Sequence, residues 1–228
     1  MLPGTWSAKA YSFFDTLLWI ACLNILWIAF TVAGLGVLGA GPATAAAHIM
    51  IRKRIRGELA PLFRSFPREV LRNFVKANAL ALPVMGIAVA MVLNWNYFSG
   101  SSGVLSNMLS LLTLVAGVLM AGALCYLFPM FARYELGTVQ YLLTSSRFAF
   151  RHLAGTVILL FVTAAAVFAS QAVPGLVPFF SIGAWLFVTG WLCDKFFTAN
   201  DESLADAEAD ADADARPVPS LGHAVSPY

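Results

Sequence analysis

Residues 17–40 read LLWIACLNILWIAFTVAGLGVLGA, and residues 41–58 continue with GPATAAAHIMIRKRIRGE. The first stretch has no formally charged side chain, and about 20 mostly apolar residues are enough for a helix to cross a bilayer. Lys9 is the only base before it, which differs from the strongly charged start of a secretory signal peptide. We therefore interpret residues 17–40 as a retained membrane span that a basic cluster follows.

The composition of the chain makes lipid its expected solvent. Of the 228 residues, 60% are hydrophobic and 11% are charged, whereas soluble domains carry about 25% charged residues. Residues 201–228 hold seven of the 12 acids and one of the 14 bases, so residues 1–200 hold 13 bases and 5 acids, a formal charge of +8. We expect a membrane domain over residues 1–200 and a disordered acidic cytoplasmic tail over residues 201–228.

Four further apolar stretches are long enough to cross a bilayer. They are Val75–Leu93, Val104–Phe131, Ala154–Val173 and Leu176–Phe197. Helices satisfy their backbone hydrogen bonds internally, as hydrocarbon requires. The sequence therefore predicts an all-α polytopic membrane protein with about five transmembrane helices.

Charge alternates along the loops between these spans. The first loop holds eight bases and the third holds Arg133, Arg147 and Arg151, whereas residues 96–103 and 171–175 of the second and fourth loops carry no charge. Basic residues near span ends stay in the cytoplasm. This pattern predicts a multi-pass membrane protein with the N-terminus outside and the C-terminus in the cytoplasm.

The first loop has the periodicity of two cytoplasmic amphipathic helices. Polar side chains recur every four residues over 42–56, at Thr44, His48, Arg52 and Arg56. Over 65–76, Phe66, Val70 and Phe74 share one face and Arg68, Arg72 and Lys76 the other, with Ser65 as the expected N-cap. Cations at a membrane boundary bind anionic headgroups or an acidic partner. We predict a lipid- or partner-binding surface made of His48, Arg52, Lys53, Arg54, Arg56, Arg68 and Arg72.

The motifs of common enzymes are missing from the sequence. It has no HExxH, GxSxG or Walker A pattern, and Cys22, Cys125 and Cys193 have no metal-site spacing. We expect no catalytic residues, no metal and no cofactor. Because the basic cluster directly follows a span, we interpret it as a membrane boundary and expect no nucleic-acid partner.

Polar and small residues inside the spans leave alternatives open. Asn24 and Thr44, with the glycine-rich segment Gly34–Pro42, are the site of a small-molecule transporter in our alternative interpretation. Small residues four apart, as at Gly36 and Ala40, favour close helix contacts. Such contacts join helices within one chain or form a homo-oligomer.

Several short motifs resemble the YesL-like bacterial membrane proteins over about residues 10–197. They are NILW at 24–27, GPATAA at 41–46, RKxIRGE at 52–58, NFxKxN at 73–78 and FPxFxRY at 128–134. That family is a domain of unknown function whose genes often neighbour carbohydrate ABC importers and glycoside-degrading enzymes. The resemblance implies a non-enzymatic accessory or scaffold protein of the bacterial cytoplasmic (inner) membrane that assists or regulates carbohydrate uptake by an ABC importer.

Overall fold

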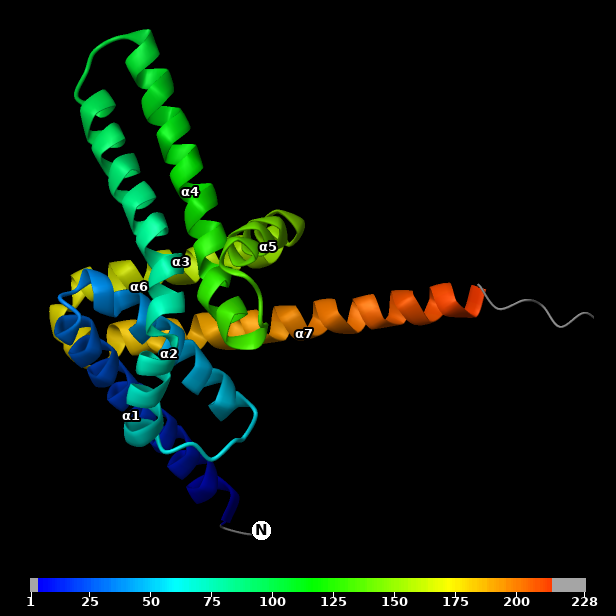
Figure 1. The fold of residues 1–228 in the computed structure, drawn as a ribbon. Coiled ribbons are helices and arrows are strands. Elements are labelled where there is room, and N and C mark those ends of the chain that lie inside the picture. Colours follow the sequence, from blue (N-terminus) through cyan, green and yellow to red (C-terminus); the bar gives the residue numbers. More distant parts are fainter. Residues whose placement is uncertain (1–3, 215–228) are drawn as a thin grey trace, which may run out of the picture. The chain divides into compact units, whose positions relative to one another are not determined.

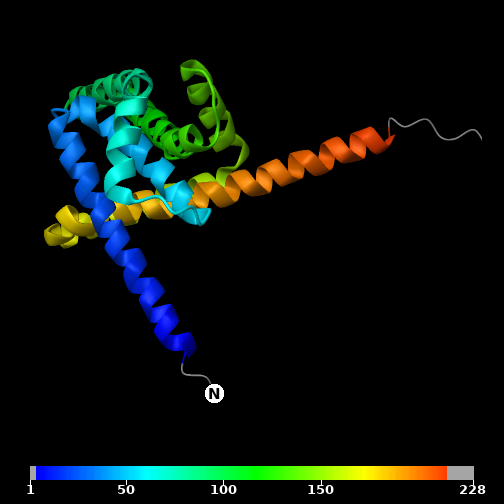
Figure 2. The ribbon, with the colours of Figure 1, turned by 60° about the horizontal axis from the view of Figure 1, so that its bottom comes forward.

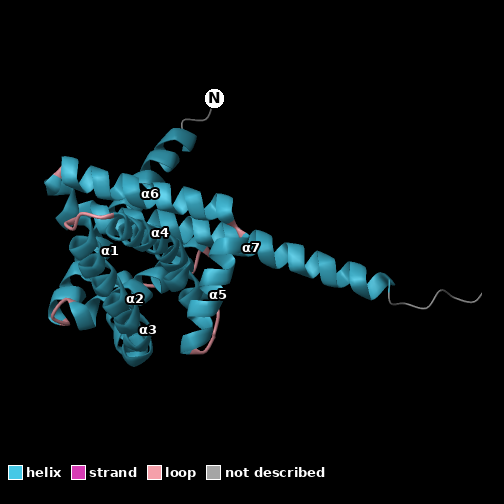
Figure 3. Ribbon diagram, turned by 90° about the horizontal axis from the view of Figure 1, so that it is seen from above, coloured by secondary structure: helices cyan, strands magenta, loops and turns pink. Residues whose placement is uncertain are grey.

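The computed structural model describes residues 4–214, and every regular element in that range is a helix (Figure 1). The elements are α1 (Gly4–Ala33), α2 (Val37–Ile55), α3 (Leu62–Ser99), α4 (Val104–Arg133), α5 (Thr138–Arg151), α6 (Leu153–Ala172), the short turns η1 (Pro174–Leu176) and η2 (Val177–Ser181), and α7 (Ile182–Asp214). Short loops join them (Figure 3). The all-α prediction is confirmed.

Five helical segments within the described residues are long and apolar enough to cross a membrane. They are Lys9–Ala33, Leu62–Ser99, Val104–Arg133, Leu153–Ala172 and Pro174–Ala209. This number agrees with the sequence prediction, and the protein is a multi-pass membrane protein.

The chain divides by its contacts into residues 1–194 and 195–228. The described part of the second unit continues α7 as helix to Asp214. The structure thus departs from the disordered tail predicted over 201–214, and residues 215–228 of that prediction lie outside the described residues. Alanine, the strongest helix former, alternates with acids from Ala205 to Ala213, which gives this segment its helix propensity.

The stretch predicted as one span over residues 17–40 is a helical hairpin. Helix α1 ends at Ala33, Leu35 and Gly36 take positive φ values of 56° and 78°, and α2 returns along α1 (Figures 1 and 2). A Cβ on Gly34 would collide with the backbone of Gly39, so the reversal requires glycine there. The basic residues at the end of α2 therefore lie beside the N-terminal half of α1, whereas the sequence prediction had put them at opposite ends.

Helix α2 is the core of the fold, not the amphipathic surface helix predicted over 42–56. Ala43, Ala45, Ala46 and Ala47 are fully buried. Such small side chains let neighbouring backbones approach closely, and a Cβ on Gly41 would lie 2.6 Å from the Cβ of Ala81 in α3.

The second predicted amphipathic helix is the first part of α3. This helix has 38 residues and passes through Pro67 and Pro83, so it joins the predicted segment 65–76 to the following span. It starts at Leu62 behind Pro61, so Ser65 is not the N-cap. Of the three residues predicted to share an apolar face, Phe66 and Val70 are buried, whereas Phe74 is 37% exposed.

Helices α3 and α4 form a second hairpin, shown in teal and green (Figures 1 and 2). Helix α5, which the sequence prediction missed, follows α4 and buries Tyr141, Ser145 and Ala149 at intervals of four residues. Its Tyr141 Oη donates a hydrogen bond to the Tyr134 carbonyl at 2.6 Å. This contact anchors α5 to the end of α4.

Candidate functional site

Arg54 at the end of α2 is held by the N-terminal half of α1. Its Nη2 lies 2.7 Å from Asp15 Oδ2, and its guanidinium carbon lies 4.8 Å from the centre of the Trp19 ring. Arg54 thus closes the open end of the α1–α2 hairpin. Because the Asp15 side chain is half exposed, this pair contributes about 1 kcal/mol or less.

Glu69 links α2 to α3 from a buried position. Its carboxylate accepts from Lys53 Nζ at 2.9 Å, from Arg72 Nη2 at 3.1 Å and from Asn73 Nδ2 at 3.3 Å. The Glu69 side chain is 6% exposed. A carboxylate this buried needs such partners, since an isolated buried charge is strongly unfavourable. Lys53 is therefore a structural cation.

Arg52 joins α2 to the end of α4. Its Nη1 donates to the carbonyls of Ala132 at 2.6 Å and Arg133 at 3.1 Å, which are among the carbonyls that a helix end leaves without partners. Burial lowers the pKa of Arg52, and the nearby cations Arg56 and Arg133 lower it further. Arg133 in turn pairs with Asp194 Oδ1 at 3.0 Å. Arg52 is also a structural cation.

His48 does not belong to a surface. Its side chain is 4% exposed and packs against α7, where a Cβ on Gly190 would lie 3.1 Å from His48 Nδ1. The prediction that His48 contributes to an exposed binding surface is therefore wrong. His48 lies one turn before Arg52, and this position of α2 faces the protein interior.

Four exposed cations lie on α3, namely Arg64, Arg68, Arg72 and Lys76. Arg64, Arg68 and Arg72 recur every four residues on its first turns and are all exposed; we call them the arginine row. Arg72 pairs with Glu69, which also pairs with Lys53. Arg56, Arg64 and Arg68 form no ion pair within the described part of the chain. Arg64 was absent from the predicted surface, although its spacing of four from Arg68 was a signal for it.

Asn24 has its polar groups bound by the protein. Its Nδ2 donates to the carbonyls of Val177 at 3.1 Å and Pro178 at 2.7 Å, and its Oδ1 accepts from the amide of Gly183 at 2.8 Å. The η2 turn breaks the regular helix pattern, and Asn24 supplies the hydrogen bonds there. In the structure Asn24 is an internal clamp between α1 and the start of α7.

Thr44 is likewise satisfied internally. Its hydroxyl donates to the Ala40 carbonyl at 2.7 Å and accepts from Trp27 Nε1 at 3.0 Å. The segment Gly34–Pro42 turns sharply at Gly36 and is helical from Val37 onward. The two residues of the transporter interpretation thus direct their hydrogen bonds to protein groups.

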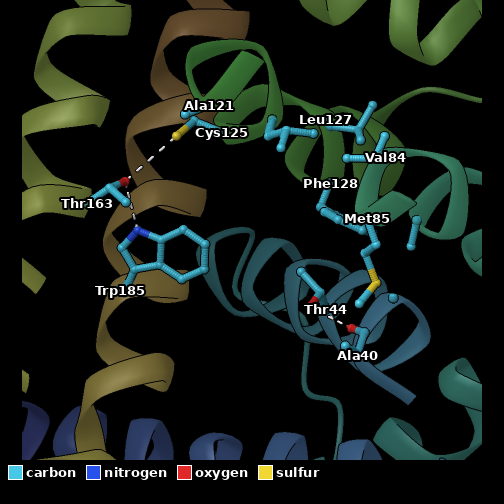
Figure 4. Close-up of a pocket in the computed structure, with 13 residues that line it drawn as sticks. Ala40, Thr44, Val84, Met85, Ala121, Cys125, Leu127, Phe128, Thr163 and Trp185 are labelled. Carbon is cyan, nitrogen blue, oxygen red and sulfur yellow. Dashed lines mark hydrogen bonds between the residues drawn. The ribbon is translucent and has the colours of Figure 1, made fainter. Parts of the chain in front are cut away.

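An apolar cavity of about 400 Å³ lies between α2, α3, α4, α6 and α7 (Figure 4). Cys125, Thr163 and Trp185 lie on one side of it and Val84, Met85 and Phe128 on the other. Thr163 and Trp185 also line a second cavity of about 500 Å³ between α6 and the start of α7. Within the described residues, no group of three or more His, Cys, Asp or Glu side chains gathers to hold a metal.

Known proteins share much of this sequence. The family model described as "Protein of unknown function, DUF624" matches residues 20–95. The chain is 33% identical to "Uncharacterized protein YesV" of Bacillus subtilis (strain 168), over 71% of this chain and 78% of YesV. It is 32% identical to "Uncharacterized protein YteU" of the same organism, over 75% of this chain and 77% of YteU.

The chain belongs to the DUF624 family. It is also 30% identical to "Uncharacterized protein YesL" of the same bacterium, over 61% of this chain and 66% of YesL, which confirms the resemblance to YesL-like proteins. No solved structure matches the chain. The DUF624 match covers the C-terminal part of α1, all of α2 and most of α3, and these segments carry Asn24, Glu69 and the arginine row.

Proposed function

We propose that the protein is a non-enzymatic accessory or scaffold protein of the bacterial cytoplasmic membrane, and that it holds an acidic partner at the arginine row. The supporting observation is that three like charges are exposed on successive turns of one helix. Like charges four residues apart destabilise a helix by about 0.2–0.5 kcal/mol per pair. An anionic surface opposite the row would attract all three arginines and so offset their mutual repulsion.

A carbohydrate ABC importer is the partner that we propose for this surface. The YesL-like resemblance points to this class of partner, and the row supplies a complementary charge for an acidic face. Electrostatic complementarity of this kind mainly sets specificity and the rate of association. Anionic lipid headgroups are the competing occupant.

We expect replacement of Arg64 and Arg68 by Gln to weaken capture of the importer by about tenfold, since each exposed charge pair contributes up to about 1 kcal/mol. The measurement is affinity purification from the native membrane with quantification of importer subunits. Arg147→Gln with Arg151→Gln is the matched control, because these two arginines are exposed on α5. Equal capture of the importer by both double variants would contradict the proposal. It would also be contradicted if the Arg64 and Arg68 double variant kept importer capture and lost only its binding to anionic vesicles.

The orientation that we propose places both ends of the described chain in the cytoplasm. Support comes from the α1–α2 hairpin, in which α2 crosses back as a sixth helix beside the five apolar spans and Asp15 pairs with Arg54 at the basic end. Because basic residues favour the cytoplasmic side, Lys9 and the N-terminal end of α1 belong there too. This replaces the outside N-terminus that an uninterrupted first span had predicted.

A reporter at the N-terminus tests this orientation. We expect green fluorescent protein fused before Met1 to fluoresce, and alkaline phosphatase at the same point to be inactive, because each folds on only one side of the membrane. Fusions within residues 100–103, between α3 and α4, should behave in the opposite way. An active phosphatase at the N-terminus would show that the hairpin does not return α2 to the side where α1 starts.

A further inference from the structure

The cavity between α2, α3, α4, α6 and α7 offers no unpaired polar side chain to a ligand. Thr44 is bonded to Ala40 and Trp27, as described above. The Thr163 hydroxyl donates to the Leu159 carbonyl at 2.8 Å and accepts from Trp185 Nε1 at 3.0 Å, with Cys125 Sγ at 3.7 Å. An occupant with its own hydrogen-bonding groups would leave them unsatisfied, at a cost of about 1–3 kcal/mol each. The cavity therefore fits hydrocarbon.

The bilayer is the source of that hydrocarbon. Val84 and Met85 on α3, Leu124 and Phe128 on α4 and Trp185 on α7 all lie on candidate membrane spans and line the cavity. A lipid chain gains no hydrophobic free energy on leaving other lipid chains, because both surroundings are apolar. A lipid that resides here must be selected by an additional contact outside the cavity.

Positively charged side chains that could make this contact lie at only one end of the α3–α4 hairpin. No residue from 77 to 132 is charged, so the α3–α4 hairpin carries cations only at its open end. Lys76 stands there, about 7.5 Å along α3 from the cavity residue Ala81. Lys76 is an exposed residue, and its Nζ lies 5.8 Å from the centre of the Phe131 ring and 5.6 Å from that of Tyr141.

We propose that this cavity holds one acyl chain of an anionic membrane lipid whose phosphate lies beside Lys76. Lys76 forms no ion pair within residues 4–214, so its charge remains available to a headgroup. Arg52 and Arg133 add positive potential at the same end of α4, although both are bonded within the protein. The lipid would fill the space between the two helical hairpins and the α6–α7 pair.

Photolabelling with two phospholipids that share one acyl chain tests the site. One probe is a phosphatidylglycerol with a diazirine near the end of its chain, and the other is the phosphatidylcholine with the same chain. Each is mixed into phosphatidylcholine vesicles that contain the purified full chain, and labelled peptides are mapped by mass spectrometry. We expect the phosphatidylglycerol probe to label the peptides around Met85 and Phe128 more strongly than the phosphatidylcholine probe does.

Two variants separate the chain from the headgroup. Val84→Phe fills the cavity and should remove most of the labelling, whereas the matched Val89→Phe, at a 59% exposed position of the same helix, should not. Lys76→Gln is an exposed change that leaves the packing intact, and it should lower phosphatidylglycerol labelling about fivefold without changing phosphatidylcholine labelling.

Three results would overturn the lipid site. They are equal labelling of wild type by the two probes, equal labelling of the Val84→Phe and Val89→Phe variants, or unchanged phosphatidylglycerol labelling in Lys76→Gln. Arg64→Gln with Arg68→Gln should leave the labelling unchanged, because these residues lie more than one turn further along α3. The proposal of the lipid site and the proposal of the importer surface can thus be contradicted independently of each other.

Discussion

Gly183→Ala is expected to destabilise the folded chain by about 2 kcal/mol or more, although alanine has the higher helix propensity. A Cβ on Gly183 would lie 2.7 Å from the Ile20 carbonyl oxygen and 2.9 Å from Asn24 Cβ. The first of these atoms is backbone, so relief requires α1 and α7 to move apart. That movement would also break the 2.8 Å hydrogen bond from the Gly183 amide to Asn24 Oδ1.

Gly86→Ala is the matched control for this crossing. Gly86 lies inside α3, and a Cβ there would meet nothing within 4 Å. The same substitution should therefore stabilise the protein by about 0.5–1 kcal/mol, because alanine loses less backbone entropy in a helix. Thermal unfolding of the purified proteins in one detergent compares the two. Similar shifts of the melting temperature in both variants would mean that α1 and α7 do not cross at Gly183.

The apolar spans could be predicted from the sequence because hydropathy reports directly on solvent. The predicted stretch Val104–Phe131 lies inside α4, and Ala154–Val173 agrees with α6 to within one residue at each end. The reversal at Gly36 was missed because residues 33–41 are apolar on both sides of the turn. Hydropathy carries no signal for a change of chain direction inside hydrocarbon.

The character of α2 was misjudged for a related physical reason. Its polar residues recur every four positions, which is typical of a solvated face. In the structure Thr44 binds Trp27, His48 packs on Gly190, and Arg52 binds the last carbonyls of α4. Buried polar groups take protein partners, so the same periodicity arises from tertiary contacts that a single helix does not reveal.

The candidate site was predicted in part. The exposed arginines Arg68 and Arg72 were identified, because the apolar face made by Phe66 and Val70 fixes the opposite side of α3. Glu69 was not identified as a partner of Lys53. It lies one position from Val70, and only the packing of α2 on α3 makes that position buried.

Glu69→Ala should destabilise the protein by about 3 kcal/mol, because removal of one member of a buried ion pair leaves the other charge without compensation. Lys53 is 30% exposed and would remain partly desolvated between α2 and α3, whereas Arg72 is 69% exposed and can turn to water. Asp15→Ala removes the acid of the exposed Arg54 pair and should cost about 1 kcal/mol or less. Thermal unfolding of the two variants measures the difference.

A double substitution shows whether Glu69→Ala destabilises the protein because Lys53 loses its counter-charge or because the side-chain packing around residue 69 is lost. Replacement of both partners by apolar side chains, Lys53→Met with Glu69→Leu, leaves no unpaired charge in the interface between α2 and α3. Such replacements of buried ion pairs are often neutral or stabilising. The double variant should therefore recover most of the stability that Glu69→Ala loses. A double variant as unstable as Glu69→Ala would mean that Glu69 acts through the hydrogen bond that its carboxylate accepts from Asn73, and that Lys53 is not held by its charge.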